Sequence, residues 1–121
     1  MSKKILIVDD DNRNIFALSA VLKSRGFTCI STTNSKEGLD MALNNKEIGI
    51  VLLDMMMPEM DGYEVLSKIR ESKVKKMPVI AVTAQAMVGD REKVLAAGAD
   101  DYVSKPVDVD KMMKVLDKFL K

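Results

Sequence analysis

Five short apolar runs alternate along the chain with five segments that have the periodicity of an amphipathic helix. The runs are rich in β-branched residues, which is typical of strands buried on both faces of a parallel sheet. This alternation predicts an α/β fold whose five-stranded parallel sheet carries helices on both faces. We expect strands over residues 4–9, 27–32, 48–54, 78–83 and 100–104, and helices over residues 12–25, from Asn34 through Leu43, around Val65 to Ile69, over residues 87–97 and from Val109 to Leu120.

Polar residues that could carry chemistry stand at the ends of the first, third, fourth and fifth strands. Asp9 ends the first expected strand with Asp10 directly after it, and Asp54 ends the third. Thr83 ends the fourth strand, and Lys105 follows the fifth. The carboxyl ends of parallel strands meet at one edge of the sheet, where open α/β sheets bind ligands. We therefore expect these acids, the hydroxyl and the amine to share one pocket.

The composition excludes several kinds of chemistry. The 121 residues contain no histidine, so Ser-His-Asp catalysis, Cys-His catalysis and histidine metal ligands are all absent. Neither a Walker-type phosphate loop nor a glycine-rich dinucleotide motif occurs. A metal ion must therefore be held by oxygen ligands, which favours a hard cation such as Mg²⁺.

Length and charge set further limits. The 121 residues fit one domain, and we expect a single domain over 1–121. The formal net charge of +1 gives no overall attraction to nucleic acid or to a membrane. No apolar stretch approaches the roughly 20 residues that cross a bilayer. The single cysteine, Cys29, cannot form an internal disulfide, so we expect a cytoplasmic protein. From its charge and its short apolar stretches we expect no direct nucleic-acid or membrane partner.

Four ordered motifs resemble the receiver domain of two-component response regulators. They are Ile-Val-Asp-Asp-Asp at 7–11, Leu-Leu-Asp-Met-Met-Met-Pro-Glu-Met-Asp-Gly at 52–62, Val-Thr-Ala at 82–84 and Gly-Ala-Asp-Asp-Tyr-Val-Ser-Lys-Pro at 98–106. The resemblance covers essentially the whole chain, and each motif falls at the end of an expected strand. It implies the flavodoxin-like (βα)₅ fold with strand order 2-1-3-4-5, which agrees with the alternation above.

The resemblance also implies roles in phosphoryl transfer. Asp54 would accept a phosphoryl group from a histidine kinase or a histidine phosphotransfer protein. Asp9, Asp10, Asp54 and the backbone carbonyl of Met56 would bind Mg²⁺, with Asp9 acting mostly through water. Lys105 and the backbone of Ala84 would contact the phosphoryl group. The chain would not be an enzyme beyond its own phosphorylation and slow dephosphorylation.

The remaining family positions concern the response to phosphorylation. Thr83 and Tyr102 would be the switch residues, and the peptide bond before Pro106 would be cis. The output would be the surface of the fourth helix, the fifth strand and the fifth helix, which would bind a downstream protein. We expect a monomer or a weak, phosphorylation-dependent dimer.

Three alternatives compete with this hypothesis. The chain could be a receiver module excised from a hybrid histidine kinase or a larger regulator, because the segment 11–14 is similar to the first-helix entry of many hybrid-kinase receivers. A phosphatase with an aspartyl-phosphate intermediate would need a second acid two residues after the nucleophile, where this chain has Met56. A pseudo-receiver that only binds proteins is disfavoured by the complete set of polar residues.

Other polar residues are predicted to have local roles. Asp11 should cap the first helix, and Asn34 with Glu37 should form a capping box at the second. Asp100 and Asp101 are expected to be loop residues at the far end of the fifth strand, without a function.

Overall fold

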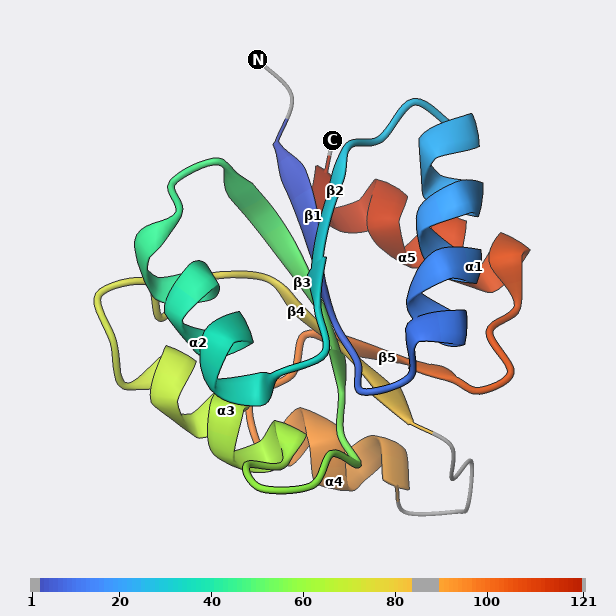
Figure 1. The fold of residues 1–121 in the computed structure, drawn as a ribbon. Coiled ribbons are helices and arrows are strands. Elements are labelled where there is room, and N and C mark those ends of the chain that lie inside the picture. The colour runs from blue at the N-terminus through green and yellow to red at the C-terminus, as the bar shows by residue number, and fades with distance from the viewer. Residues whose placement is uncertain (1–2, 84–89, 121) are drawn as a thin grey trace.

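The computed structural model describes residues 3–83 and 90–120, and its strands and helices alternate as predicted (Figure 1). The strands are β1 (Lys4–Val8), β2 (Cys29–Thr32), β3 (Ile48–Asp54), β4 (Val79–Thr83) and β5 (Asp101–Ser104). The helices are α1 (Asn12–Ser24), α2 (Ser35–Asn44), α3 (Gly62–Arg70), α4 (Asp90–Ala96) and α5 (Val109–Leu120). Within the described ranges, no helix combines the length and the apolar character that a membrane crossing requires.

All five strands are parallel and lie in the order β2-β1-β3-β4-β5, which confirms the flavodoxin-like arrangement. The register pairs Val8 with Leu53, and Thr83 with Ser104. The residues that follow these positions therefore emerge side by side at the carboxyl edge of the sheet.

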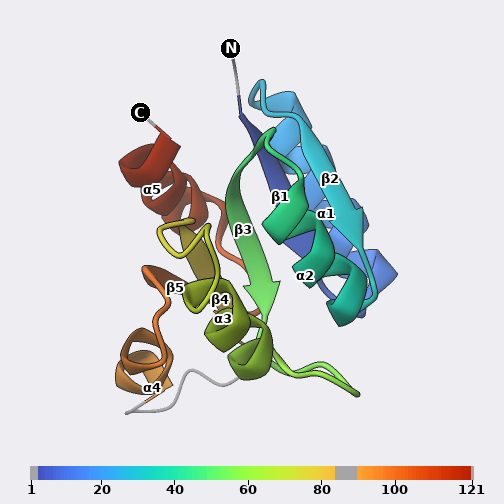
Figure 2. The ribbon, with the colours of Figure 1, turned by 90° about the vertical axis from the view of Figure 1, so that its left-hand side faces the viewer.

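Two hydrophobic clusters hold the helices against the sheet. Successive side chains of a strand point to opposite faces, so Leu6 and Val8 pack under α2 and α3 whereas Ile5 and Ile7 pack under α1 and α5. Figure 1 shows α1 and α5 on one side of the sheet, and Figure 2 views the molecule from the side covered by α2 and α3. Both faces of the central strands are buried, which explains their continuous apolar sequence.

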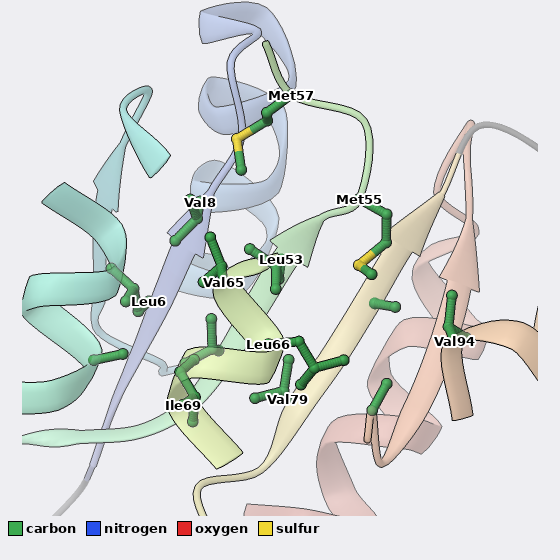
Figure 3. Close-up of a cluster of buried hydrophobic side chains, with 14 of the residues drawn as sticks. Leu6, Val8, Leu53, Met55, Met57, Val65, Leu66, Ile69, Val79 and Val94 are labelled. Atoms are coloured by element: carbon green, nitrogen blue, oxygen red, sulfur yellow. The ribbon is translucent and has the colours of Figure 1, made fainter. Parts of the chain in front are cut away.

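The methionines after β3 alternate between the core and solvent. Met55 and Met57 are 2% and 7% exposed and belong to the cluster beneath α3 (Figure 3). Met56 lies between them in sequence and is 59% exposed. The two buried side chains therefore anchor the loop that follows Asp54.

Polar caps fix where the first two helices begin. Asp11 accepts a hydrogen bond from the backbone N–H of Arg13 at 2.9 Å, which confirms the predicted cap of α1. Asn34 accepts one from the N–H of Glu37, as the capping box requires. The Glu37 carboxylate, however, accepts from the Thr32 hydroxyl at 2.7 Å instead of returning to the Asn34 backbone. The Asn34 N–H donates to that same hydroxyl oxygen, so Thr32 replaces half of the predicted box.

The prediction of loop residues without a role is right for the position of Asp100, which precedes β5, but wrong for Asp101 and for the lack of contacts. Asp101 is the first residue of β5, and Asp100 accepts hydrogen bonds from the Arg70 guanidinium at 2.9 Å and from the Val79 N–H at 2.8 Å. Arg70 also donates to the carbonyl oxygens of Lys75, Met77 and Gly98. This network ties the end of α3 to the starts of β4 and β5, at the edge of the sheet opposite Asp54.

Candidate functional site

Three aspartates gather at the carboxyl ends of β1 and β3. Asp9, Asp10 and Asp54 each offer a carboxylate oxygen, and these oxygens all lie within 4.8 Å of one another. Asp9 and Asp54 are each 2% exposed, whereas Asp10 is exposed to solvent. The cluster is therefore open to solvent on one side and enclosed by the sheet on the other.

Lys105 brings a positive charge to this cluster from the end of β5. Its ammonium nitrogen lies 3.3 Å from Asp9 Oδ2 and 3.4 Å from Asp54 Oδ2. Its backbone N–H donates to the carbonyl oxygen of Thr83 at 2.7 Å, which fixes the chain leaving β5 against the end of β4. The Lys105–Pro106 peptide bond is cis, as predicted.

Burial and neighbouring charges both shift the ionisation of the site. Burial raises the pKa of Asp54 to about 6, with a further rise from the charge of Asp9, although the Met56 N–H and the Lys105 charge act to lower it. For Lys105, burial acts to lower the pKa, but the charges of Asp9 and Asp54 outweigh it, so the pKa is raised. Among the described residues, the site holds three carboxylates and one ammonium, so a bound cation would reduce the remaining repulsion between the acids.

Local hydrogen bonds hold the carboxylates of Asp54 and Asp9. Asp54 Oδ1 accepts from the Met56 N–H at 3.0 Å. Asp9 Oδ1 accepts from the Asp11 N–H at 2.9 Å, and Asp9 Oδ2 accepts from the Asn14 side-chain amide at 2.5 Å. The sequence reasoning missed Asn14. The available signal was an amide side chain early in the helix that follows Asp10.

The proposed switch residues lie on the two strands beyond β3. Thr83 is the last residue of β4 and is 6% exposed, next to Ser104 in the register of β5. Tyr102 is half-buried on β5 and packs against the cluster beneath α3 and α4. Ala84 lies outside the described residues, so its contact with a phosphoryl group stays a prediction. The role of the Met56 carbonyl as a metal ligand also stays a prediction.

The donor set of this site fits a hard divalent cation. Its three carboxylates offer only oxygen, and their oxygens are close enough together to share one ion. Mg²⁺ is bound in proteins through one or two carboxylates together with water and phosphate oxygens. Asp9, Asp10 and Asp54 are the residues that could hold it.

A second feature is a groove of about 600 Å³ along β5 and α5. One wall is β5 with Tyr102, and the other is the face of α5 that carries three lysines, Lys111, Lys114 and Lys118. Pro106 and Val115 supply apolar surface in the same groove. Tyr102 lines this groove and also packs against the core, so it borders both.

Proteins that resemble this chain in sequence and fold belong to the response regulators. A family model described as the response regulator receiver domain matches residues 5–117. The polar-differentiation response regulator DivK of Brucella anthropi is 33% identical over 121 residues, which cover 99% of this chain and 98% of DivK.

Solved structures of receiver domains match the fold over nearly the whole chain. A CheY-like response regulator receiver domain protein from Methanospirillum hungatei JF-1 has a TM-score of 0.88 and 31% identity, covering 99% of this chain and 94% of that one. The receiver domain of a sensor histidine kinase from Pseudomonas aeruginosa PAO1 has a TM-score of 0.88 and 30% identity, covering 99% and 98%. That structure holds a magnesium ion coordinated in its active-site cleft.

Proposed function

Since the chain belongs to the response regulator receiver family, we propose that it is a phosphoacceptor signalling domain whose Asp54 takes a phosphoryl group from a phosphohistidine. The donor would be a histidine kinase or a histidine phosphotransfer protein. One observation carries this proposal: Asp54, at the end of the central strand β3, lies 3.4 Å from Lys105 and shares a cluster with Asp9 and Asp10. Lys105 lies as close to Asp9, so the choice of Asp54 as the acceptor rests on the receiver motif at residues 52–62.

The environment of Asp54 suits a carboxylate nucleophile. With a pKa raised to about 6 in the absence of metal, its side chain is still mostly ionised at neutral pH. An Asp54 oxygen attacks the phosphorus, forming a P–O bond as the P–N bond to the donor imidazole breaks. The imidazole keeps the electron pair of that bond and takes up a proton. Such transfers depend on positioning and charge neutralisation more than on covalent help from the protein.

The residues around Asp54 supply that positioning. Asp9 and Asp10 would hold Mg²⁺ together with Asp54, and the magnesium ion in the Pseudomonas receiver supports this assignment. When bound, the ion would neutralise charge on the phosphoryl oxygens. The Lys105 ammonium already faces Asp54 Oδ2, where it would meet a second phosphoryl oxygen.

Thr83 and Tyr102 would convert phosphorylation into a change of surface. The Thr83 carbonyl accepts the backbone N–H of Lys105, so the end of β4 and the phosphate-facing lysine are already linked. We infer that the Thr83 hydroxyl binds the phosphoryl group and that Tyr102 changes its packing in response. Phosphorylation must lower the free energy of the state with Thr83 bound to the phosphoryl group relative to the state without it, or no signal passes.

The output surface would be formed by α4, β5 and α5, and its partner would carry acidic residues. The three lysines of the groove outnumber its one acid among the described residues, Asp108, and Lys118 already pairs with Asp101 at 3.3 Å. A downstream protein that places carboxylates beside an apolar residue would match these lysines and Val115. We propose a cytoplasmic protein that is monomeric or a weak, phosphorylation-dependent dimer.

The same site would serve a receiver module of a larger histidine kinase. The likeness to the receiver of a sensor histidine kinase favours this second arrangement, whereas DivK favours a separate regulator. An aspartyl-phosphate phosphatase is disfavoured because Met56 occupies the position where its second acid is required.

Intact mass measurement after incubation with acetyl phosphate and Mg²⁺ tests the proposal. We expect one phosphoryl adduct on the protein, lost in Asp54→Asn and on chelation of the metal. Asp11→Asn is the matched control, because Asp11 caps α1 and asparagine caps a helix equally well. An adduct that persists in Asp54→Asn would refute the assignment.

A further inference from the structure

We propose that Asn14 is a positioning residue for the cation site, because its side-chain amide holds Asp9 in place without neutralising it. This inference rests on the proposed function and concerns a residue that the four receiver motifs do not include. Asn14 lies on the first turns of α1 and donates to Asp9 Oδ2 at 2.5 Å.

The carboxylate of Asp9 is clamped from both sides. Its Oδ1 accepts the backbone N–H of Asp11 at 2.9 Å, and its Oδ2 accepts the amide of Asn14. Lys105 Nζ approaches the same Oδ2 at 3.3 Å. A carboxylate that is 2% exposed cannot rely on bulk water, so these three donors define its orientation.

The chain makes this clamp rigid through the start of α1. Asp11 caps the helix by accepting the N–H of Arg13, while its own N–H donates to Asp9. Ile15 and Leu18 are buried against the sheet, which fixes the rotation of α1 about its axis. Asn14 is thereby directed back toward the end of β1.

A neutral donor on Asp9 matters because Lys105 is shared. The ammonium lies almost equally close to Asp9 and to Asp54, at 3.3 and 3.4 Å. When it turns to a phosphoryl oxygen on Asp54, Asp9 Oδ2 loses its charged partner. The Asn14 amide then keeps the carboxylate oriented and still anionic, so that it continues to serve the cation.

The count of accepting positions on Asp9 supports a role through water. Each carboxylate oxygen has roughly two positions that accept hydrogen bonds. Asn14 and Lys105 occupy those of Oδ2, and the Asp11 N–H occupies one on Oδ1. The remaining position suits a hydrogen bond from a cation-bound water. Groups that orient such a carboxylate typically change metal affinity by about 10- to 100-fold when removed.

Magnesium titrations of Asn14→Ala and of the wild type test this inference directly. The readout is the dissociation constant of Mg²⁺ alone, obtained from the backbone amide shifts of residues 9, 10 and 54. We expect the constant to rise about tenfold in Asn14→Ala. Asn12→Ala is the matched control, because Asn12 is an exposed asparagine at the start of the same helix, and it should bind Mg²⁺ like the wild type.

A second variant separates positioning from helix stability. Asn14→Leu keeps much of the side-chain volume without the donor, and thermal unfolding with and without Mg²⁺ reports folding and binding together. We expect Asn14→Leu to show a smaller stabilisation by Mg²⁺ than Asn12→Ala does. If both Asn14 variants bind Mg²⁺ as tightly as the wild type and lose only melting temperature, the amide merely tethers the helix and the inference is wrong. If the wild type itself fails to bind Mg²⁺, the proposed function fails instead.

Discussion

Lys105 and Asp54 face each other across the site, with Nζ 3.4 Å from Oδ2, although Lys105 follows β5, Asp54 ends β3 and β4 lies between these strands. The backbone bond from Lys105 to Thr83 and the register of β4 with β5 set this approach. The ammonium reduces the repulsion between Asp9 and Asp54 in the unphosphorylated protein. The same group is placed to meet the phosphoryl group after transfer.

Replacing Lys105 by methionine should destabilise the protein in the absence of Mg²⁺. Asp9 and Asp54 would lose a shared cation in a largely buried site, which we expect to cost about 1–3 kcal/mol after allowing for partial solvent screening. Urea unfolding without metal measures the loss. Lys111→Met, an exposed lysine on α5, is the control and should change stability by less than about 0.5 kcal/mol. Equal losses in the two variants would mean that Lys105 has no special role in the cluster.

Replacing Asp54 by asparagine should stabilise the metal-free protein at neutral pH. Because folding raises the pKa of Asp54 to about 6, the folded state disfavours its charged form. The resulting destabilisation is present above that pKa and disappears as the pH falls through the pKa of the unfolded chain. We expect Asp54→Asn to be more stable by about 1–3 kcal/mol near neutral pH and equal to the wild type near pH 4.

Urea unfolding across this pH range, in a chelating buffer, checks both the size and the sign. Asp61→Asn is a suitable control, because Asp61 caps α3 and asparagine preserves the cap. A stability difference for Asp54→Asn that grows as the pH falls would contradict the raised pKa.

Phe16 should contribute to recognition of a protein donor. Its side chain is 77% exposed on α1, the helix that begins directly after the acid cluster. A large exposed aromatic ring is a frequent anchor at protein interfaces. We predict that Phe16→Ala slows transfer from a phosphorylated histidine phosphotransfer domain by about tenfold or more.

A small phosphoryl donor provides the control for that measurement. Acetyl phosphate touches no surface beyond the site, so its rate should be the same in Phe16→Ala and the wild type. Lys23→Ala, in the last turn of α1, should leave both rates unchanged. A parallel loss with both donors would place the effect in the site itself.

Met56 should prolong the acyl phosphate. Its side chain is 59% exposed and follows Asp54 by two positions, so it can shield the phosphoryl group from water. We expect Met56→Asn to shorten the lifetime of the phosphorylated protein, measured as release of inorganic phosphate. Glu59→Gln alters the same loop without changing this position and should leave the lifetime as it was. An unchanged lifetime in Met56→Asn would rule out the shielding.

The periodicity of the sequence was sufficient to predict a parallel sheet and the meeting of acids at one edge, whereas the strand order came from the resemblance to receiver domains. Buried strands need continuous apolar residues, and parallel strands align their carboxyl ends. Asp9, Asp54 and Lys105 could therefore be placed together although they are far apart in the chain.

Polar contacts between loops and helix faces could not be predicted in the same way. The hydrogen bond from Asn14 to Asp9 depends on the direction in which α1 leaves β1. The Arg70–Asp100 network joins residues far apart in the chain that neither the helix nor the strand periodicity connects. Thr32 displaced Glu37 from the Asn34 backbone because β2 ends within reach of that N–H. The burial of Met55 and Met57 around an exposed Met56 likewise depends on the path of the loop.

The most direct test of the central claim is to locate the phosphoryl group itself. After reaction with a phosphohistidine donor, borohydride reduces an aspartyl phosphate to homoserine, which tandem mass spectrometry places in the sequence. We predict homoserine at position 54 and unmodified aspartate at positions 9, 10 and 11. Homoserine at another aspartate, or a phosphoester on Thr83 or Ser104 with Asp54 unchanged, would contradict the account.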